Sequence, residues 1–384
     1  MKINSLYVHI PFCESICDYC DFTKLQYFHN FATKYLATLK QEITSKHINY
    51  KLKTIFVGGG TPTSLEDDLF LDLMSFLSTN VDNNTEFSVE CNPESLSKSK
   101  VEIMKKYGVN RISIGVESTN NEILKSINRK HTFEDVIKAV NLAREIGIDN
   151  INLDLILGLP NVTTKLLETD IKNIISLNPD HISCYGLTVH EHTVFFINGI
   201  EPPKDDILRK MYEIVNQRLT DAGYCHYEVS NWSKENKECL HNLTYWRDEE
   251  YFGVGLGASG YENGVRYTNT KNLDKYLNNY KEKDYEEVVT LKDDKTYYLM
   301  TNLRTRYGIN LADYKKKFNE DIYELHKEYF DNLAKHNIIN INIKENRIYC
   351  TFEGMMTLDQ ILLKIIWLYK KIKFLYTFSL IQLS

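Results

Sequence analysis

The sequence predicts an α/β protein in which an incomplete barrel of six strand–helix units, (βα)6, precedes a smaller C-terminal α+β domain. Three observations lead to this prediction. Short β-branched or apolar runs alternate with longer helical segments in the first half of the chain. Glycine, cysteine and acidic residues follow these runs, at the strand ends where parallel α/β proteins place their chemistry. After about residue 286 the pattern changes to helices followed by two short strands.

The barrel prediction depends on six runs with the length and composition of buried strands. They cover residues 6–10, 54–57, 86–90, 111–115, 150–155 and 181–185. Helical spacing between them implies crossover helices and therefore parallel strands. A doubly wound sheet has the same local pattern. The barrel is favoured by the residues at or just beyond the strand ends, which are Cys13, residues 58–60, Glu90, Glu117 and Asp154.

We expect three regions along the chain. Residues 1–200 form the barrel, and residues 201–285 are a connecting region rich in aromatic residues and glycine. Residues 286–384 form the accessory domain, with helices at 311–318 and 322–336 and strands at 338–343 and 347–352. Helices followed by a small β-sheet indicate a winged-helix-like domain.

Composition bounds the class of protein. Hydrophobic residues make up 43% and charged residues 26% of 384 residues, the balance of a globular protein with a core. With 46 Lys and Arg against 52 Asp and Glu, the net charge of −6 provides no general attraction to nucleic acid. An apolar signal core and an apolar stretch of spanning length are both missing, so we expect a cytoplasmic protein.

The stretch 361–384 is apolar with lysines interspersed. It predicts a terminal helix that packs on the accessory domain, with a peripheral membrane contact as the alternative.

Three cysteines form the most specific motif. Cys13, Cys17 and Cys20 have the spacing C-x3-C-x2-C directly after the first predicted strand. Three thiolates can hold three irons of a [4Fe-4S] cluster and leave the fourth iron open to a ligand. The alternative is structural zinc with His9 as fourth ligand, although zinc sites usually pair C-x2-C with a second, distant pair.

This loop resembles the signature of the radical S-adenosylmethionine (SAM) family. The runs 9–13 and 20–22 are similar to the branch that contains oxygen-independent coproporphyrinogen III oxidase and the heme chaperone HemW, and the likeness extends from Tyr7 to about Gln360. The resemblance implies a [4Fe-4S] cluster, bound SAM and an electron donor such as flavodoxin or ferredoxin. One-electron reduction would cleave SAM to methionine and a 5′-deoxyadenosyl radical.

The resemblance also assigns residues to SAM. Gly59, Gly60 and Thr61 belong to a Gly-Gly-Gly-Thr-Pro stretch similar to the motif that lines the amino end of SAM. Tyr7 resembles the tyrosine at the SAM carboxylate, and Tyr19 fills the aromatic position beside the adenine.

Four further positions match the family's SAM site. Glu90 is similar to the acidic residue that closes the third strand, and Arg129 to an arginine suited to a carboxylate. Asp154 resembles an aspartate that accepts from ribose hydroxyls. Glu117 departs from the family, which usually has glutamine there. A carboxylate has no amide donor and adds negative charge, so Glu117 cannot make the donor contact of the family's glutamine.

Two features favour the chaperone over the oxidase. Phe22 stands where the oxidase has an additional cysteine, and the oxidase's long N-terminal extension has no counterpart before Tyr7. The resemblance then implies heme as cargo and an acceptor such as a respiratory hemoprotein. In the run 241–246, His241 is a candidate iron ligand, with a structural loop histidine as the alternative reading.

Two other functions remain open. One is oxygen-independent coproporphyrinogen III oxidation in porphyrin biosynthesis. The other is a metal-binding regulator whose C-terminal domain binds DNA, which the net negative charge disfavours. The sequence assigns no catalytic residue.

Overall fold

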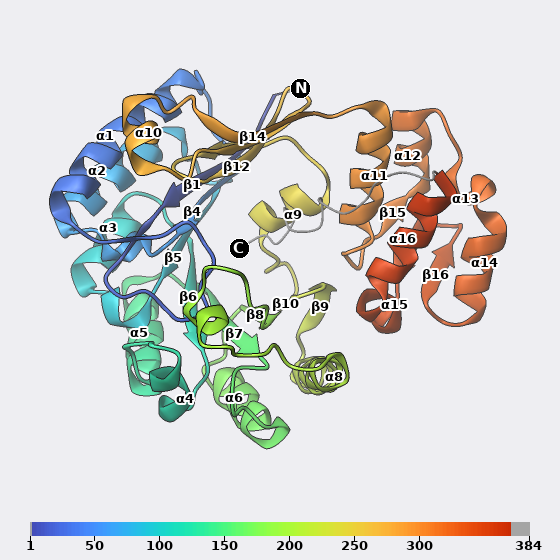
Figure 1. Cartoon of the computed structure of the whole chain (residues 1–384), viewed down its shortest axis with the longest axis horizontal. Helices are drawn as coiled ribbons and strands as arrows, with labels where there is room; N and C mark the ends of the chain where they lie inside the picture. Colours follow the sequence, from blue (N-terminus) through green and yellow to red (C-terminus); the bar gives the residue numbers. More distant parts are fainter. Residues whose placement is uncertain (1, 370–384) are drawn as a thin grey trace. The chain divides into compact units, whose positions relative to one another are not determined.

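The computed structural model describes residues 2–369 and divides into two compact units (Figure 1). Unit 1 comprises residues 2–225, 230–241 and 250–288. Unit 2 comprises residues 226–229, 242–249 and 289 to the end of the described chain. Residues 370–384, most of the predicted apolar tail, lie outside the described residues.

All six predicted strands are confirmed. They are β1 (Ser5–Ile10), β4 (Thr54–Gly59), β5 (Glu86–Cys91), β6 (Arg111–Glu117), β7 (Asn150–Leu157) and β8 (His181–Gly186). Each pairs in parallel with the next along the chain, so a crossover follows each strand. With β9 (Cys225–Glu228), β10 (Asn231–Ser233) and β11 (Phe252–Val254), the complete sheet has the order β11-β1-β4-β5-β6-β7-β8-β10-β9. Its two ends do not pair with each other, and the barrel is therefore open.

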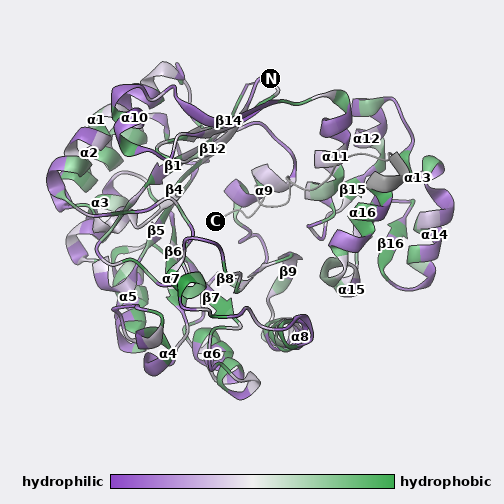
Figure 2. Ribbon diagram, viewed as in Figure 1, coloured by the Kyte–Doolittle hydropathy of each residue, from purple (hydrophilic) through white to green (hydrophobic). Residues whose placement is uncertain are grey.

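Helices cover the outer face of this sheet (Figure 1). They are α1 (His29–Ser45), α2 (Asp67–Leu77), α3 (Lys98–Lys106), α4 (Asn121–Ser126), α5 (Phe133–Ile146), α6 (Thr164–Ser176) and α8 (Asp205–Asp221). Each long helix buries one apolar stripe; that of α1 includes Tyr35, Leu36 and Leu39. Figure 2 shows this alternation of hydrophobic and hydrophilic residues along the helices. The main core therefore lies between these helices and the sheet.

Short elements connect the strands of unit 1. They are β2 (Phe12–Cys13), β3 (Leu25–Gln26), α7 (Val194–Ile197), α10 (Leu273–Asn278) and the 3-10 turns Pro62–Ser64, Ser78–Asn80 and Pro93–Ser95. Two further elements, β9 (Cys225–Glu228) and α9 (Leu240–Trp246), contain residues of both units.

Residues 201–285 differ from the connecting region expected from the sequence. They contribute α8 and several short strands, namely β10 (Asn231–Ser233), β11 (Phe252–Val254), β12 (Ser259–Glu262), β13 (Val265–Asn269) and the start of β14 (Lys283–Val288). Strand β11 extends the main sheet by pairing in parallel with β1. Buried Glu42 of α1 holds this segment, because its carboxylate accepts from Gly255 N (2.9 Å), Asn269 Nδ2 (2.9 Å) and Tyr276 Oη (2.7 Å).

Unit 2 has its own core beneath a three-stranded antiparallel sheet. The sheet has the order β15-β17-β16 and consists of β15 (Ile309–Asn310), β17 (Arg347–Cys350) and β16 (Ile339–Asn342). Its helices are α11 (Leu291–Asn302), α12 (Leu311–Phe318), α13 (Ile322–Leu325), α14 (Lys327–Lys335), α15 (Phe352–Met356) and α16 (Leu358–Tyr369). The predicted helix 322–336 breaks at His326, whose φ of −125° is not helical. Within residues 2–369, no helix combines the length and apolar character needed to cross a bilayer.

Candidate functional site

Most of the predicted cluster and SAM residues lie at or near the carboxyl ends of the parallel strands of unit 1. The cysteine loop follows β1, the glycine run ends β4, Glu90 lies near the end of β5, and Glu117 ends β6. In a parallel sheet these ends meet at one edge, so residues far apart in sequence can converge on one ligand.

The three cysteines are free thiols on this edge. Cys13 is buried, and Cys17 and Cys20 are half-buried. Burial raises the pKa of the Cys13 thiol and raises that of Cys20 to about 12. Thiolates are the form that binds iron, so a metal must displace these protons. Nearby Lys24 and Arg129 counter the burial by favouring the charged form of Cys13.

Arg129 connects the cysteine loop to the ends of β5 and β6. Its guanidinium donates to Gly115 O, to Asn92 Oδ1 (3.2 Å) and to Cys17 Sγ (3.6 Å). Its Nε is buried and has no hydrogen-bond partner among the described residues. A buried donor without a partner is costly, so this atom indicates an absent acceptor, which a ligand carboxylate would supply.

The glycine run forms a cradle for the cysteine loop. A Cβ on Gly60 would lie 2.9 Å from Cys13 Sγ and 2.8 Å from Pro11 O. A Cβ on Gly59, whose φ is +119°, would lie 2.6 Å from the His9 ring. Thr61 follows at once and donates from Oγ1 to Cys13 Sγ at 3.7 Å. Only glycine fits here, and the donor set of three thiols in this cradle is suited to an iron–sulfur cluster.

Glu90 reaches back to this run. Its Oε2 accepts from Gly59 N at 3.0 Å. The Glu90 pKa is raised to about 8, mainly by burial and in part by the charges of Asp154 and Glu117, while the Gly59 N–H and Arg111 oppose the rise. A cation bound beside Glu90 would favour its ionised form.

Glu117 lies in a β-bulge at the end of β6 and has a left-handed φ of 64°. This conformation costs a non-glycine residue about 1–3 kcal/mol. The bulge turns the carboxylate toward Arg129, with Oε1 3.5 Å from Nη2, and Tyr19 donates a hydrogen bond to it. Burial raises the pKa of Glu117 while Arg129 lowers it. The structure therefore places Glu117 as the partner of Arg129 and Tyr19.

Asp154 of β7 lies in the barrel interior beside β6. Its carboxylate accepts from Ser113 Oγ (2.9 Å) and from Asn152 Nδ2 (2.7 Å). Burial raises its pKa, and these donors oppose the rise. The two oxygens retain acceptor capacity, since a carboxylate has about four lone-pair sites.

Tyr7 and His9 form a closed pair next to the site. Tyr7 Oη donates to His9 Nδ1 at 3.0 Å, and His9 Nε2 donates to Thr23 O at 2.8 Å. Burial lowers the His9 pKa to about 4. Both imidazole nitrogens are engaged, so His9 is unavailable as the fourth ligand of a zinc site.

Asn92 is a site residue that the sequence reasoning missed. Its Oδ1 accepts from Arg129, and its Nδ2 donates to Thr61 Oγ1 at 3.3 Å. It therefore links Arg129 to the threonine that contacts Cys13. In the sequence, only the position of Asn92 after a predicted strand could have indicated this role. The Asn-Pro pair there is equally typical of an ordinary turn.

His241, the predicted heme ligand, lies at the opposite end of the strands. Its Nδ1 is 2.7 Å from Oγ1 of Thr54, the first residue of β4, and its ring stacks on Phe56 at 5.2 Å between centroids. It is 1% exposed, and burial lowers its pKa to about 3. Along β4 this position is about 16 Å from the cysteine end. Ligation by His241 stays a prediction, and it requires this packing to open.

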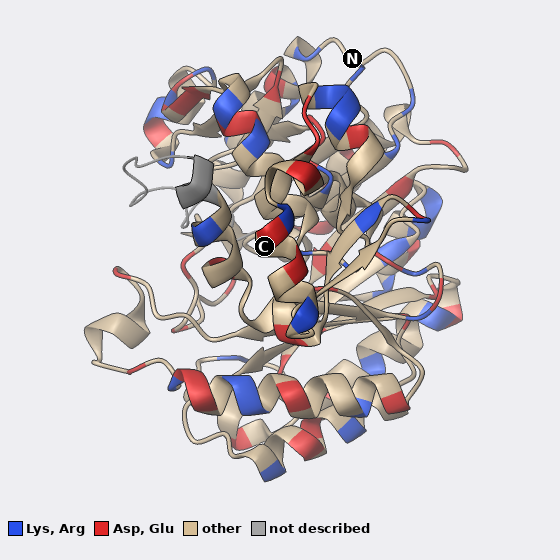
Figure 3. Ribbon diagram, turned by 90° about the vertical axis from the view of Figure 1, so that its right-hand side faces the viewer, with Lys and Arg blue, Asp and Glu red and all other residues tan. Residues whose placement is uncertain are grey.

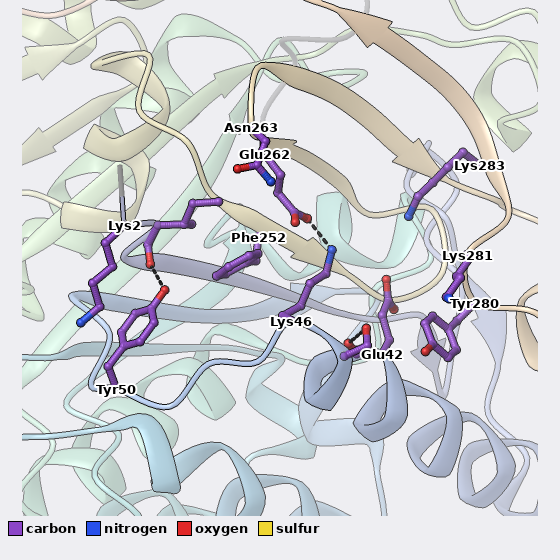
Figure 4. Close-up of a pocket in the computed structure, with 12 residues that line it drawn as sticks. Lys2, Glu42, Lys46, Tyr50, Phe252, Glu262, Asn263, Tyr280, Lys281 and Lys283 are labelled. Carbon is purple, nitrogen blue, oxygen red and sulfur yellow. Dashed lines mark hydrogen bonds and ion pairs between the residues drawn. The ribbon is translucent and has the colours of Figure 1, made fainter.

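A cavity of about 520 Å³ lies away from the cysteines (Figure 4). Its lining includes Lys2 and Ile3, which precede β1, and Lys46, which follows α1. It therefore lies at the end of β1 opposite to Cys13. Lys46 forms an ion pair with Glu262 there.

Comparisons with known proteins agree with this geometry. Residues 7–174 match the Radical SAM superfamily. The chain is 37% identical over 368 residues to the heme chaperone HemW of Bacillus subtilis, covering 92% of this chain and 97% of that protein. It is 36% identical to HemW of Lactococcus lactis, covering 92% and 94%. The solved structure of coproporphyrinogen III oxidase (HemN) from Escherichia coli has a TM-score of 0.79 at 23% identity, covering 96% of this chain and 90% of that one, and shows the shared fold.

The cysteines provide the first prediction. Replacing Cys13, Cys17 or Cys20 with Ala should abolish the content of about four irons and the broad thiolate-to-iron absorption after anaerobic reconstitution. Cys225→Ala, at an exposed cysteine, is the matched control and should retain both. Iron analysis and absorption spectra measure this. Stoichiometric zinc without iron-dependent absorption would contradict the assignment.

The second prediction concerns Glu117 and Asp154. Glu117→Gln should leave SAM affinity unchanged or raise it, because Arg129 is released from a competing carboxylate. Asp154→Ala should weaken binding by about 1.5–3 kcal/mol, since a charged acceptor is lost. Calorimetry checks both, with Glu122→Gln on α4 as control. A strong loss with Glu117→Gln and none with Asp154→Ala would overturn the assignment.

The third prediction follows from the raised pKa of Glu90. Between pH 4.5 and about 8 the folded chain holds a proton on Glu90 that the unfolded chain has released, so this contribution to stability falls as pH rises. Glu90→Gln removes that dependence. Its stability relative to wild type should therefore grow across this range and level off above it. Urea unfolding of the iron-free protein at several pH values measures the difference, and a pH-independent difference would refute the shift.

Proposed function

The chain belongs to the radical SAM superfamily and, within it, to the HemW family, and from this premise we propose that it binds heme and passes it to an acceptor protein. Membership of the superfamily implies a [4Fe-4S] cluster and SAM. The observation that carries the proposal is the likeness to HemW over 92% of the chain. The free cysteines agree with it, since Cys13 is joined to Arg129 through Thr61 and Asn92.

The chain's own residues divide the binding task. Cys13, Cys17 and Cys20 would hold three irons and leave the fourth open. Arg129 presents its unpartnered Nε to a carboxylate, and Glu90 presents an oxygen to a cationic group. When bound, the cluster and SAM supply one-electron chemistry. The protein orients them and excludes water.

Coproporphyrinogen oxidation is the second candidate, because the HemN fold is shared over 96% of the chain. Phe22 weighs against it. By the resemblance in sequence, this side chain stands where the oxidase has an additional cysteine, and it is 43% exposed. The chemistry expected of a thiol there is unavailable to a phenyl ring.

A DNA-binding role for unit 2 has less support. Figure 3 shows Lys and Arg mixed with Asp and Glu over the helices. Two of the three lysines at the end of α12 are paired with acids, Lys315 with Asp321 (3.2 Å) and Lys317 with Asp294 (2.7 Å). Paired cations contribute little to phosphate binding. The acceptor, the electron donor, the membrane contact and the cytoplasmic location stay predictions.

The fourth prediction separates chaperone from oxidase. Full-length protein reconstituted under anaerobic conditions should bind heme stoichiometrically and should not oxidise coproporphyrinogen III. A carrier must hold the finished iron-containing ring, whereas an oxidase must hold an iron-free porphyrinogen. Heme titration and a coproporphyrinogen assay on the same sample measure both. Turnover with SAM consumed and no heme bound would promote the oxidase.

A further inference from the structure

An exposed apolar surface lies on the rim of the barrel beside the cysteine loop. Helix α7 exposes three of its four side chains: Val194 is 39%, Phe196 51% and Ile197 74% exposed. Figure 2 shows this helix as a hydrophobic segment. Phe22, two residues after Cys20, is also exposed. Exposed apolar groups gathered in one place commonly mark a binding surface.

Helix α7 is attached to the cysteine loop. Phe195, its buried residue, donates from its backbone N to Asp18 O at 3.0 Å. The Phe195 ring contacts Tyr19, with centroids 6.3 Å apart. Thr193 caps the helix by accepting from Phe196 N. The exposed residues of α7 and Phe22 are thus held by the same short segment, residues 18–22.

The same rim holds an imidazole oriented by a carboxylate. His190 Nε2 lies 3.3 Å from Oδ2 of Asp21, the residue after Cys20. The two side chains are 30% and 39% exposed. With Nε2–H directed at the carboxylate, Nδ1 carries the lone pair, and it has no partner in the part of the chain that the structure describes. Histidines that bind metals usually donate their other N–H to a carboxylate or carbonyl in this way.

A cation lies next to Phe22. Lys24 Nζ donates to Cys20 O and to Phe22 O, the latter at 3.4 Å, and is half-buried. The Lys24 ammonium can therefore pair with the carboxylate of a ligand that lies against the Phe22 ring.

From these observations we propose that this rim, formed by Phe22, Lys24, His190, Val194, Phe196 and Ile197, is the surface that receives heme. His190 Nδ1 donates its lone pair to the iron, the apolar side chains cover the ring, and Lys24 pairs with a propionate. One N–Fe bond forms as an axial water leaves, with no electron transferred. The inference rests on the proposed function and assigns the iron ligand to His190, whereas the sequence predicted His241.

Two other histidines provide matched controls. His192 is in the same loop and exposed, but no carboxylate of the described residues pairs with it. His29 has a carboxylate partner, Glu66, at 3.1 Å from Nδ1, and lies beside exposed Phe28 and Phe31. A second acid, Asp68, lies in the same cluster as His29 and Glu66. The two negative charges would repel the propionates of heme.

The experiment is a hemin titration of the full-length protein, followed by the Soret band. His190→Ala should weaken binding by more than tenfold and change the band, and added imidazole should restore the wild-type spectrum. Asp21→Asn should weaken binding about tenfold. His192→Ala and His29→Ala should bind as wild type. Unchanged iron content and thermal unfolding of each variant would show that the cluster and the fold are intact.

Iron-free protoporphyrin distinguishes ligation from ring contact. His190→Ala should leave its affinity unchanged, whereas Phe196→Ser combined with Ile197→Ser should lower the affinity for both rings. If His241→Ala abolishes heme binding and His190→Ala does not, the inference is wrong and the proposed function stands. If wild-type protein binds no heme, the proposed function fails.

Discussion

The Arg129 guanidinium is the contact on which the geometry of the site depends. It reaches Gly115 O on β6, Asn92 after β5 and Cys17 in the loop after β1. The residues before it hold the same loop, since Ile127 O accepts from Asp18 N at 3.3 Å and Asn128 Nδ2 donates to Ile16 O at 2.8 Å. Because a planar fork of donors fixes direction as well as distance, one side chain connects β6 with the segments that follow β5 and β1.

Electrostatics follows from this arrangement. Three buried or half-buried carboxyls, Glu90, Glu117 and Asp154, affect one another's protonation, and burial raises the pKa of each. Arg129 compensates Glu117 directly, at 3.5 Å, whereas the positive charge of Arg111 offsets only part of the rise in the Glu90 pKa. A ligand with both a positive centre and a carboxylate would satisfy Glu90 and the free Nε of Arg129 together. The site is therefore suited to a zwitterion, which is the chemistry of an amino acid such as the methionine part of SAM.

The sequence was sufficient for features that depend on local pattern. Strand-and-helix alternation predicted all six parallel strands, and the spacing of the three cysteines predicted their shared loop. It was insufficient where a contact joins distant segments. The packing of His241 against Thr54 spans 187 positions, and the left-handed bulge at Glu117 depends on a register shift in β6. Strand β11 has three residues and no alternation of its own, so only the edge of β1 makes it a strand.

Histidine shows why residue type alone does not identify a ligand. His9 has both nitrogens bonded, and His241 is packed beneath aromatic rings, so burial explains both without iron. His190 differs because a carboxylate lies at one nitrogen, while the other nitrogen has no partner among the described residues. Asp21 and Phe22, which serve this outer surface, directly follow Cys20. Residues 18–22 contact α7 through Asp18 and Tyr19 and contact His190 through Asp21, so a shift of the cysteine loop would also move this surface.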